Sequence, residues 1–426
     1  MAQISRLQST PHSLRRTAWP AWQWLGCGLV ALGLAGCTSP EGTAEKPAAP
    51  VATTTVAPAP APVVALPYAD AVQLAARDLF TKADLPAGAT YNVVIDPLVD
   101  GTTGVQSVAT AALEKQLVGM VKSTYPQYEI KRFSATNVAS LPLVFIGTFT
   151  PINLQGKADA ERDAYRICFA LADLKTGKIV SKGFARSQTG GVDNTPIPYF
   201  QDSPLWVNDK VVDGYIKTCQ GSKIGDAVPP AYLDRIVAAT AIDEAMNAYN
   251  DKKYREALAL YNAVLRNPAN DQPRVQAGLY LTQLKLGQRT AAMRAFGKVV
   301  QYGLDNDRLA VKFNFRPAGT GFAADGAPYE LWLREIARVA AAKPTPCFEV
   351  AGHTSRGGAE QLNESVSLQR AEYVRQRMVV EKKELAKRVI SSGLGSRQAM
   401  VGTAHNDASD ALDRRIEFKP GTSCSS

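Results

Sequence analysis

The residues best suited to chemistry stand in the last quarter of the chain. A Gly-His-Thr-Ser segment at 352–355 precedes Asn363 and Arg370. Hydroxyl, amide and guanidinium groups form hydrogen bonds with polar ligands, and the planar guanidinium matches a carboxylate. Acid–base chemistry has little support, because the chain has three histidines and neither metal-ligand spacing nor a Gly-x-Ser-x-Gly elbow accompanies them. We therefore expect a binding site, and we expect no enzyme, no metal and no other cofactor.

A second candidate is Cys37, which follows an apolar run. Basic residues at positions 6, 15 and 16 precede this run, which covers 25–36 and ends in Leu-Ala-Gly. With roughly twelve residues it is too short for a bilayer of ~30 Å, and it suits a signal peptide. The segment resembles a bacterial lipobox. The resemblance implies a signal peptide over 1–36 and lipidation of Cys37, and Thr38 in place of Asp implies the outer membrane. The alternative is an ordinary secretory signal with an incidental cysteine.

Cysteines outside the N-terminal segment predict disulfide bonds. Removing Cys27 with the signal and lipidating Cys37 leaves Cys168, Cys219, Cys347 and Cys424. An even number in an oxidising periplasm permits disulfides, and four cysteines allow three pairings. Proximity within domains favours Cys168–Cys219 and Cys347–Cys424.

Composition excludes several classes of protein. Of the 426 residues 46% are apolar and 20% are charged, which excludes full disorder, collagen and a polytopic membrane protein. The formal charge of +9 includes the arginines of the expected signal peptide, and no long basic run remains. We therefore expect no nucleic-acid partner. The length predicts several domains, of mixed α/β and α+β class.

The segments before residue 221 predict a tether and a folded domain. Residues 37–67 are rich in Pro and Ala and cannot bury a core, which predicts a semi-extended tether. Residues 68–221 predict an α/β domain. Helical patterns cover 68–80, 107–124 and 209–219, and strand patterns cover 91–96, 128–133, 143–150, 165–172 and 179–185.

Residues 231–304 predict helices with an internal repeat of about 35 residues. Ala257, Tyr261 and Leu265 recur as Ala292, Phe296 and Val300. The pattern resembles two tetratricopeptide-type helical hairpins, and a plain four-helix connector is the alternative. Because about three repeats are needed to bury a solenoid core, we expect two units to pack on a flanking domain or to bind a partner.

Residues 308–420 carry several ordered motifs. They include Phe-Glu-Val-Ala-Gly-His-Thr at 348–354, Asn363, Val-Ser-Leu-Gln-Arg-Ala-Glu-Tyr-Val at 366–374, Ser-Gly-Leu-Gly at 392–395 and Asp-Arg-Arg-Ile-Glu at 413–417. In these motifs and their spacing, the segment resembles the peptidoglycan-associating C-terminal domain family of outer-membrane protein A (OmpA). The resemblance implies a βαβαβ sandwich that binds peptidoglycan.

The same resemblance assigns roles to single residues. In the family, an aspartate after the Gly-x-Thr turn meets the ammonium of diaminopimelate in the stem peptide, and a helix arginine meets its carboxylate. Arg370 stands at that arginine position, and Ser355 stands in place of the aspartate. Losing one charge-assisted contact costs about 1.5–3 kcal/mol, so we expect weakened binding. Asn363 and Arg415 complete the predicted peptidoglycan-binding set. Alternatively, Arg370 is a solvated helix residue and Arg415 pairs with Glu417 or another acid.

The sequence thus predicts an outer-membrane lipoprotein, lipid-anchored and facing the periplasm, that binds peptidoglycan non-covalently and links membrane to cell wall. Its other modules would recruit an envelope protein partner. The alternative is an envelope scaffold or an assembly or regulatory lipoprotein, in which the α/β and helical-repeat modules bind the partner and the OmpA-like domain is degenerate.

Overall fold

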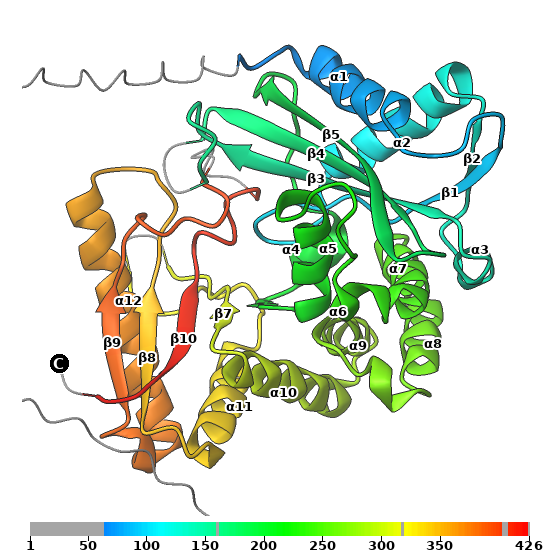
Figure 1. Cartoon of the computed structure of the whole chain (residues 1–426). Helices are drawn as coiled ribbons and strands as arrows, with labels where there is room; N and C mark the ends of the chain where they lie inside the picture. The colour runs from blue at the N-terminus through cyan, green and yellow to red at the C-terminus, as the bar shows by residue number, and fades with distance from the viewer. Residues whose placement is uncertain (1–63, 159–161, 317–318, 403–407, 425–426) are drawn as a thin grey trace, which may run out of the picture. The chain divides into compact units, whose positions relative to one another are not determined.

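The computed structural model describes residues 64–158, 162–316, 319–402 and 408–424. The predicted signal peptide, Cys37 and residues 38–63 of the predicted tether therefore lie outside the described residues. The chain is a mixed α/β protein with two mixed sheets (Figure 1). None of the helices in the described ranges combines the length and apolar character that crossing a bilayer requires.

The first sheet has the strand order β2-β1-β3-β4-β5. Its strands are β1 Tyr91–Ile95, β2 Tyr128–Lys131, β3 Leu143–Ile152, β4 Ala164–Asp173 and β5 Lys178–Gln188. β1 pairs in parallel with β2 and β3, whereas β3, β4 and β5 pair antiparallel. β3 is buried on both faces, because its side chains alternate between two cores: Phe145 and Phe149 belong to one, and Val144 and Ile146 to the other.

Helices cover both faces of this sheet. On one face lie α1 Tyr68–Thr81 and α2 Val108–Thr124. On the other lie α5 Lys210–Gln220 and α6 Pro230–Leu233, together with the short α3 Ala135–Ala139. α2 begins one residue later than expected, because Ser107 forms a capping box with Thr110 and remains extended. Before α1, the amide of Leu66 donates to the Arg186 carbonyl at 2.9 Å, so the end of the predicted tether pairs with β5.

The predicted helical repeats form two antiparallel hairpins. They consist of α7 Ile236–Asn250, α8 Tyr254–Val264, α9 Pro273–Lys285 and α10 Arg289–Asp305, with a 3-10 turn at Pro268–Asn270. α8 and α9 approach closely at Gly278, where a Cβ would lie 2.2 Å from the Tyr261 ring. These helices share one core with the C-terminal sheet. Phe296 stacks on Trp332 of α11 (Tyr329–Ala342), with 5.9 Å between the ring centroids. The hairpins therefore pack on the flanking domain, one of the two outcomes expected from the sequence.

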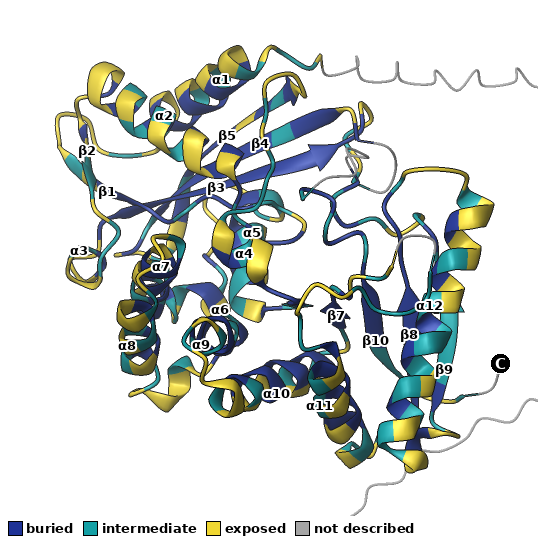
Figure 2. Cartoon of the chain, turned by 180° about the vertical axis from the view of Figure 1, so that it is seen from behind, coloured by how far each residue is buried: buried dark blue, intermediate teal, exposed yellow. Residues whose placement is uncertain are grey.

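The second sheet has the order β6-β7-β10-β8-β9. Its strands are β6 Leu205–Val207, β7 Leu309–Val311, β8 Cys347–Gly352, β9 Val389–Gly393 and β10 Ile416–Gly421. Its helices are α11 Tyr329–Ala342 and α12 Glu360–Glu381, with a 3-10 turn at Lys383–Leu385. β8 and β9 are parallel, and β10 runs antiparallel to β8 and β7. β7, most of β8 and the first half of β10 are buried (Figure 2).

β6 is one of the elements that sequence patterns did not predict, as are α3 and β9. It follows the short helix α4 Pro198–Asp202 and pairs antiparallel with β7, Leu205 opposite Val311. Its three residues are too few for a recognisable alternation. A segment from before α5 thus completes the edge of the C-terminal sheet.

Both sheets carry a disulfide. Cys168 of β4 bonds Cys219 of α5 with a Cα–Cα distance of 5.9 Å. Cys347 at the start of β8 bonds Cys424 near the C-terminus with a Cα–Cα distance of 5.2 Å. The structure therefore contains the pairing that proximity favoured among the three alternatives.

Candidate ligand-binding site

The predicted site lies where β8 ends and α12 begins. Two glycines let α12 lie directly on β8 and β9. A Cβ at Gly352 would be 2.0 Å from the carbonyl oxygen of Ser367, and one at Gly393 would be 2.5 Å from that of Glu364. Larger residues would push the helix away from the strands. The motif glycines therefore set the distance between the 353–358 loop and the residues of α12.

Backbone hydrogen bonds hold this loop in place. The amide of His353 donates to the Arg415 carbonyl at 3.0 Å, and that of Thr354 donates to the Gly395 carbonyl at 2.9 Å. The Asn363 side-chain amide donates to the Gly357 carbonyl at 3.1 Å. Asn363 is itself buried. In this structure it therefore shapes the loop, and its role toward a ligand stays a prediction.

The two hydroxyl residues of the loop are also buried. Ser355, at the position of the family's aspartate, is 6% exposed. The neighbouring Thr354 Oγ1 has no hydrogen-bond partner among the described residues. The predicted peptidoglycan-binding set includes Ser355 but not Thr354. A serine hydroxyl can accept a hydrogen bond but brings no negative charge to the site.

Arg370 presents a guanidinium that forms no ion pair with any residue the structure describes. Its Nε donates to the Gly319 carbonyl at 3.4 Å, and its guanidinium carbon lies 4.8 Å from the centre of the Phe315 ring. The side chain is half-buried, and burial lowers its pKa. Within the described part of the chain no carboxylate pairs with Arg370 or with Arg356 in the loop. Two cations and no paired acid favour an anionic group in a ligand.

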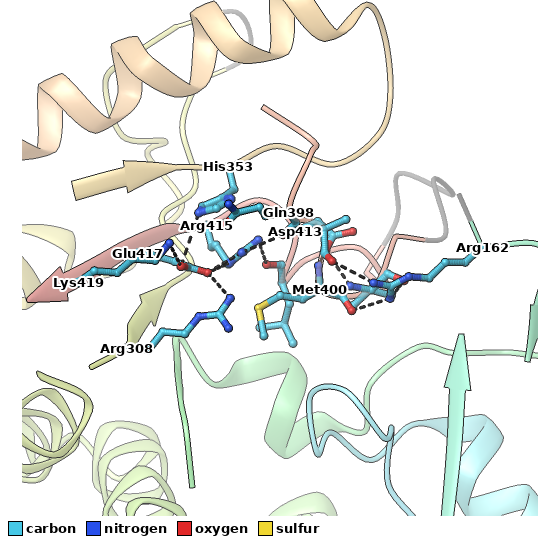
Figure 3. A network of polar contacts seen from close by, with 12 residues as sticks. Arg162, Arg308, His353, Gln398, Met400, Asp413, Arg415, Glu417 and Lys419 are labelled. Carbon is cyan, nitrogen blue, oxygen red and sulfur yellow. Dashed lines mark hydrogen bonds and ion pairs between the residues drawn. The ribbon is translucent and has the colours of Figure 1, made fainter. Parts of the chain in front are cut away.

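Arg415, by contrast, forms its hydrogen bonds with groups inside the protein (Figure 3). Its Nε donates to Glu417 Oε1 at 2.7 Å, and one Nη donates to the Gln398 carbonyl at 3.0 Å. Neither side chain of the Arg415–Glu417 pair is exposed. Arg415 was among the residues predicted to bind peptidoglycan, with pairing to Glu417 as the alternative. The structure contains that pairing.

Glu417 is the centre of this buried network. Arg308 Nη2 lies 2.7 Å from its Oε1, and Lys419 Nζ lies 2.9 Å from its Oε2. Burial alone would raise the pKa of Glu417, but the guanidinium groups of Arg415 and Arg308 hold that pKa well below its usual value. His353 Nε2 lies 3.7 Å from Glu417. Burial, with Arg415, lowers the pKa of His353 to about 3, so its imidazole is neutral near pH 7.

The side chains of Asp413 and Arg162 hold the loop that follows β9 (Figure 3). The Asp413 carboxylate accepts the amides of Met400 at 2.6 Å, Val401 at 2.8 Å and Gly402 at 2.8 Å. From the β3–β4 connection, Arg162 donates to the carbonyl oxygens of Met400 at 2.6 Å and Ala399 at 3.0 Å. Asp413 was visible as part of a motif. Arg162 had no sequence signal, because it stands 238 residues from Met400.

Comparison with known proteins locates the C-terminal domain. Residues 327–412 match the model of the OmpA family, so the chain carries an OmpA-like α/β domain at its C-terminus. The family resemblance seen in the sequence is thereby confirmed. No curated protein matches the chain. Within the described residues, no group of three or more His, Cys, Asp or Glu side chains is arranged to hold a metal ion.

Several solved structures are also similar to part of the chain. The peptidoglycan-associated lipoprotein from Burkholderia pseudomallei is 21% identical, with a TM-score of 0.23, covering 27% of this chain and 91% of that one. The cell wall anchor of the T6SS from Pseudomonas aeruginosa is 21% identical, with a TM-score of 0.23, covering 26% of this chain and 80% of that one. A periplasmic domain of MotB is 17% identical, with a TM-score of 0.23, covering 27% of this chain and 63% of its own length, which is under two thirds.

Proposed function

We propose that this protein is an outer-membrane lipoprotein that binds peptidoglycan non-covalently through its OmpA-like domain and links the membrane to the cell wall. OmpA-like domains are typically peptidoglycan-binding modules of envelope proteins. The observation that carries the proposal is Arg370, a half-buried arginine within the matched motif that has no carboxylate partner among the described residues.

The chemistry at Arg370 suits the carboxylate end of a diaminopimelate stem peptide. With Nε directed to Gly319 and the guanidinium plane near Phe315, the remaining N–H groups can meet a ligand carboxylate. Ser355 offers the ligand's ammonium a neutral acceptor instead of an anion. A neutral hydrogen bond is roughly half as strong as a charge-assisted one, so binding should be weaker by tenfold or more than with an aspartate.

The N-terminal part supplies the anchor. Lipidation of Cys37 would hold the chain in the outer membrane, with two or more acyl chains giving stable attachment. A Pro-rich tether extends by at most ~3.1 Å per residue in a polyproline conformation, which holds the folded part away from the lipid. The OmpA-like domain would then face the periplasm, where the cell wall lies.

A second candidate function is an envelope scaffold whose α/β region and tetratricopeptide-like hairpins bind a protein partner. Ser355 favours it, because replacing the family's aspartate removes one of the two charged contacts to the ligand. The two candidates differ in one measurable property, which is affinity for peptidoglycan fragments.

Calorimetric titration of the full chain in detergent with a soluble diaminopimelate-containing muropeptide tests the proposal. We expect saturable binding by the wild type, weaker binding by Arg370→Ala and tighter binding by Ser355→Asp. Arg377→Ala is the matched control, because Arg377 lies on the same helix and pairs with Glu330. Thermal unfolding verifies that each variant is folded. If no folded form binds, or if Arg370→Ala binds like the wild type, peptidoglycan binding at this site is wrong and the scaffold function takes its place.

A further inference from the structure

A cavity lies at the carboxyl end of β1, away from the OmpA-like site. Its volume is about 50 Å³, and its wall includes Asp96 after β1, Asp209 before α5, Asp243 of α7, and Gln272 and Arg274 at the start of α9. β1 is parallel to both of its neighbours. In open α/β sheets, ligands bind outside the carboxyl ends of parallel strands.

Two buried polar atoms in this wall lack partners. Asp209 is the N-cap of α5: its carboxylate accepts the Val211 amide at 2.9 Å through Oδ1, while Oδ2 is buried with no hydrogen bond among the described residues. Gln272 precedes α9, and its Nε2 is likewise buried without a partner. The two residues are 6% and 8% exposed. Because an unsatisfied buried polar group carries its full desolvation penalty, the wall is complementary to a molecule with a donor for Asp209 and an acceptor for Gln272.

The charges of the wall indicate which donor and which acceptor. Asp96 accepts the Tyr232 hydroxyl at 2.7 Å, and no Lys or Arg of the described residues forms an ion pair with Asp96, Asp209 or Asp243. Arg274 is the cation of this wall, and its Nη2 donates to the Gly104 carbonyl at 2.7 Å. Carboxyl groups in excess favour a cationic donor, and Arg274 beside Gln272 favours an anionic acceptor.

Size limits the molecule to a few atoms. At about 10–15 Å³ for each water, the cavity corresponds to roughly three to five waters, or a molecule of about five or six non-hydrogen atoms. A larger cavity of about 500 Å³ shares Pro97 and Asp243 with it.

We propose that this cavity binds a small α-amino acid, with its ammonium at Asp209 and its carboxylate at Gln272 and Arg274. The inference is independent of the function proposed for the OmpA-like domain, because none of the cavity residues belongs to residues 327–412. A glycine or alanine molecule has the required size and carries both groups on one carbon.

Titratable groups around the cavity make this binding sensitive to pH. Burial raises the pKa of Asp96 to about 7, that of Asp243 to about 6, and that of Glu114 on α2 to about 7. The other charged groups that face the cavity are Asp209, Arg274 and Arg132. The hydroxyls of Tyr215 and Tyr232 also face it, and burial raises the pKa values of these two hydroxyls well above 10. A bound ammonium favours the charged carboxylates, so binding should release protons near pH 6.5 and tighten between pH 6 and pH 8.

The experiment is calorimetric titration of the full chain in detergent with glycine, L-alanine and D-alanine. We expect one-to-one saturable binding of at least one of them, with proton release shown by buffers of different ionisation enthalpy. Asp209→Asn keeps the acceptor for the Val211 amide but removes the charge, and it should weaken binding roughly tenfold or more. Asp213→Asn is the matched control, since Asp213 is exposed on the same helix and lies outside the cavity.

A second variant and a second ligand test the two ends of the cavity separately. Gln272→Leu should also weaken binding. It replaces Asp209→Asn as the test variant if thermal unfolding shows that Asp209→Asn is not folded. No saturable heat with any of the three amino acids would mean that the cavity holds only water and would overturn the proposal. Methylamine binding as tightly as glycine would overturn the role given to Gln272 and Arg274. Equal binding by Asp209→Asn and wild type would overturn the role given to Asp209.

Discussion

Arg415 and Glu417 form a buried ion pair at the start of β10, with Arg415 Nε 2.7 Å from Glu417 Oε1 and neither side chain exposed. The two residues are separated by one position on an extended segment, so their side chains point to the same face. The pair joins β10 to Arg308 just before β7. Of the two arginines named from the sequence, Arg370 is therefore the one that pairs with no carboxylate in the described part of the chain.

Replacing Glu417 by Gln should destabilise the protein strongly. The change leaves the buried Arg415 and the half-buried Arg308 around a neutral group, and breaking the buried Arg415–Glu417 pair in this way costs about 3–5 kcal/mol. Urea unfolding followed by circular dichroism measures the loss. Glu384→Gln, at an exposed position, is the control and should change stability by less than ~0.5 kcal/mol. A loss of similar size in both variants would contradict the structural role of the network.

His353 should make the protein sensitive to mild acid. Its pKa is about 3 in the folded protein and 6.5 in an ordinary environment. Between these values the unfolded chain binds a proton that the folded protein does not, so stability falls as pH decreases from about 6.5 toward 3. From pH 7 to pH 4.5 we expect His353 to remove about 2–3 kcal/mol. Glu417 adds little to this loss of stability between pH 7 and pH 4.5, because the stability that its carboxylate contributes is lost only below its unfolded pKa near 4.5.

The comparison with His353→Gln isolates this contribution. Stability measured by urea unfolding at pH 7 and pH 4.5 should fall less in the variant than in the wild type, by the same ~2–3 kcal/mol. Equal losses in both proteins would mean that His353 is protonated in the folded state and is not buried as described.

Arg162→Ala should loosen the loop after β9. The loop would lose the donors to Ala399 and Met400 but keep the Asp413 carboxylate. We expect faster hydrogen exchange in peptides that contain residues 399–402 and a stability loss of about 1–3 kcal/mol. Arg266→Ala, at an exposed position, is the control. Unchanged exchange in Arg162→Ala would show that this contact does not restrain the loop.

Peptide mapping without reduction should recover Cys168–Cys219 and Cys347–Cys424. The second bond closes a loop with a sequence separation of 77, so Cys424→Ser should cost about 2–4 kcal/mol. Free thiols at all four positions, or bonds that join the two pairs to each other, would reject this pairing. The double variant with Cys168→Ser and Cys219→Ser measures in the same way how much the disulfide of the first sheet contributes to stability.

Cys37→Ser should abolish lipid attachment, because the thiol is the predicted acylation site. Cells grown with labelled palmitate should label the wild type and not the variant, and the variant should stay unprocessed or soluble. The Cys27→Ser protein is the control, since Cys27 lies within the predicted signal peptide. Persistent labelling of Cys37→Ser would exclude this cysteine as the anchor.

Local patterns determined much of the architecture. The helix over 68–80, the apolar runs that became β3 and β4, and the ordered motifs of 348–374 could all be recognised, because periodicity and motif spacing are properties of neighbouring residues. The disulfide pairing was favoured for a related reason, since each bond joins cysteines within one sheet region.

Contacts between distant segments were decided by the tertiary structure. β6 is too short to show a pattern and exists because β7 offers it a free edge. Arg162 carries no motif, and the carbonyl oxygens that it meets lie more than 230 residues away. Arg415 and Glu417 are two positions apart, so an extended backbone puts them on one face, but only the pairing of β10 with β7 and β8 turned that face inward. Burial of a charge depends on what covers it, and the covering residues come from other parts of the chain.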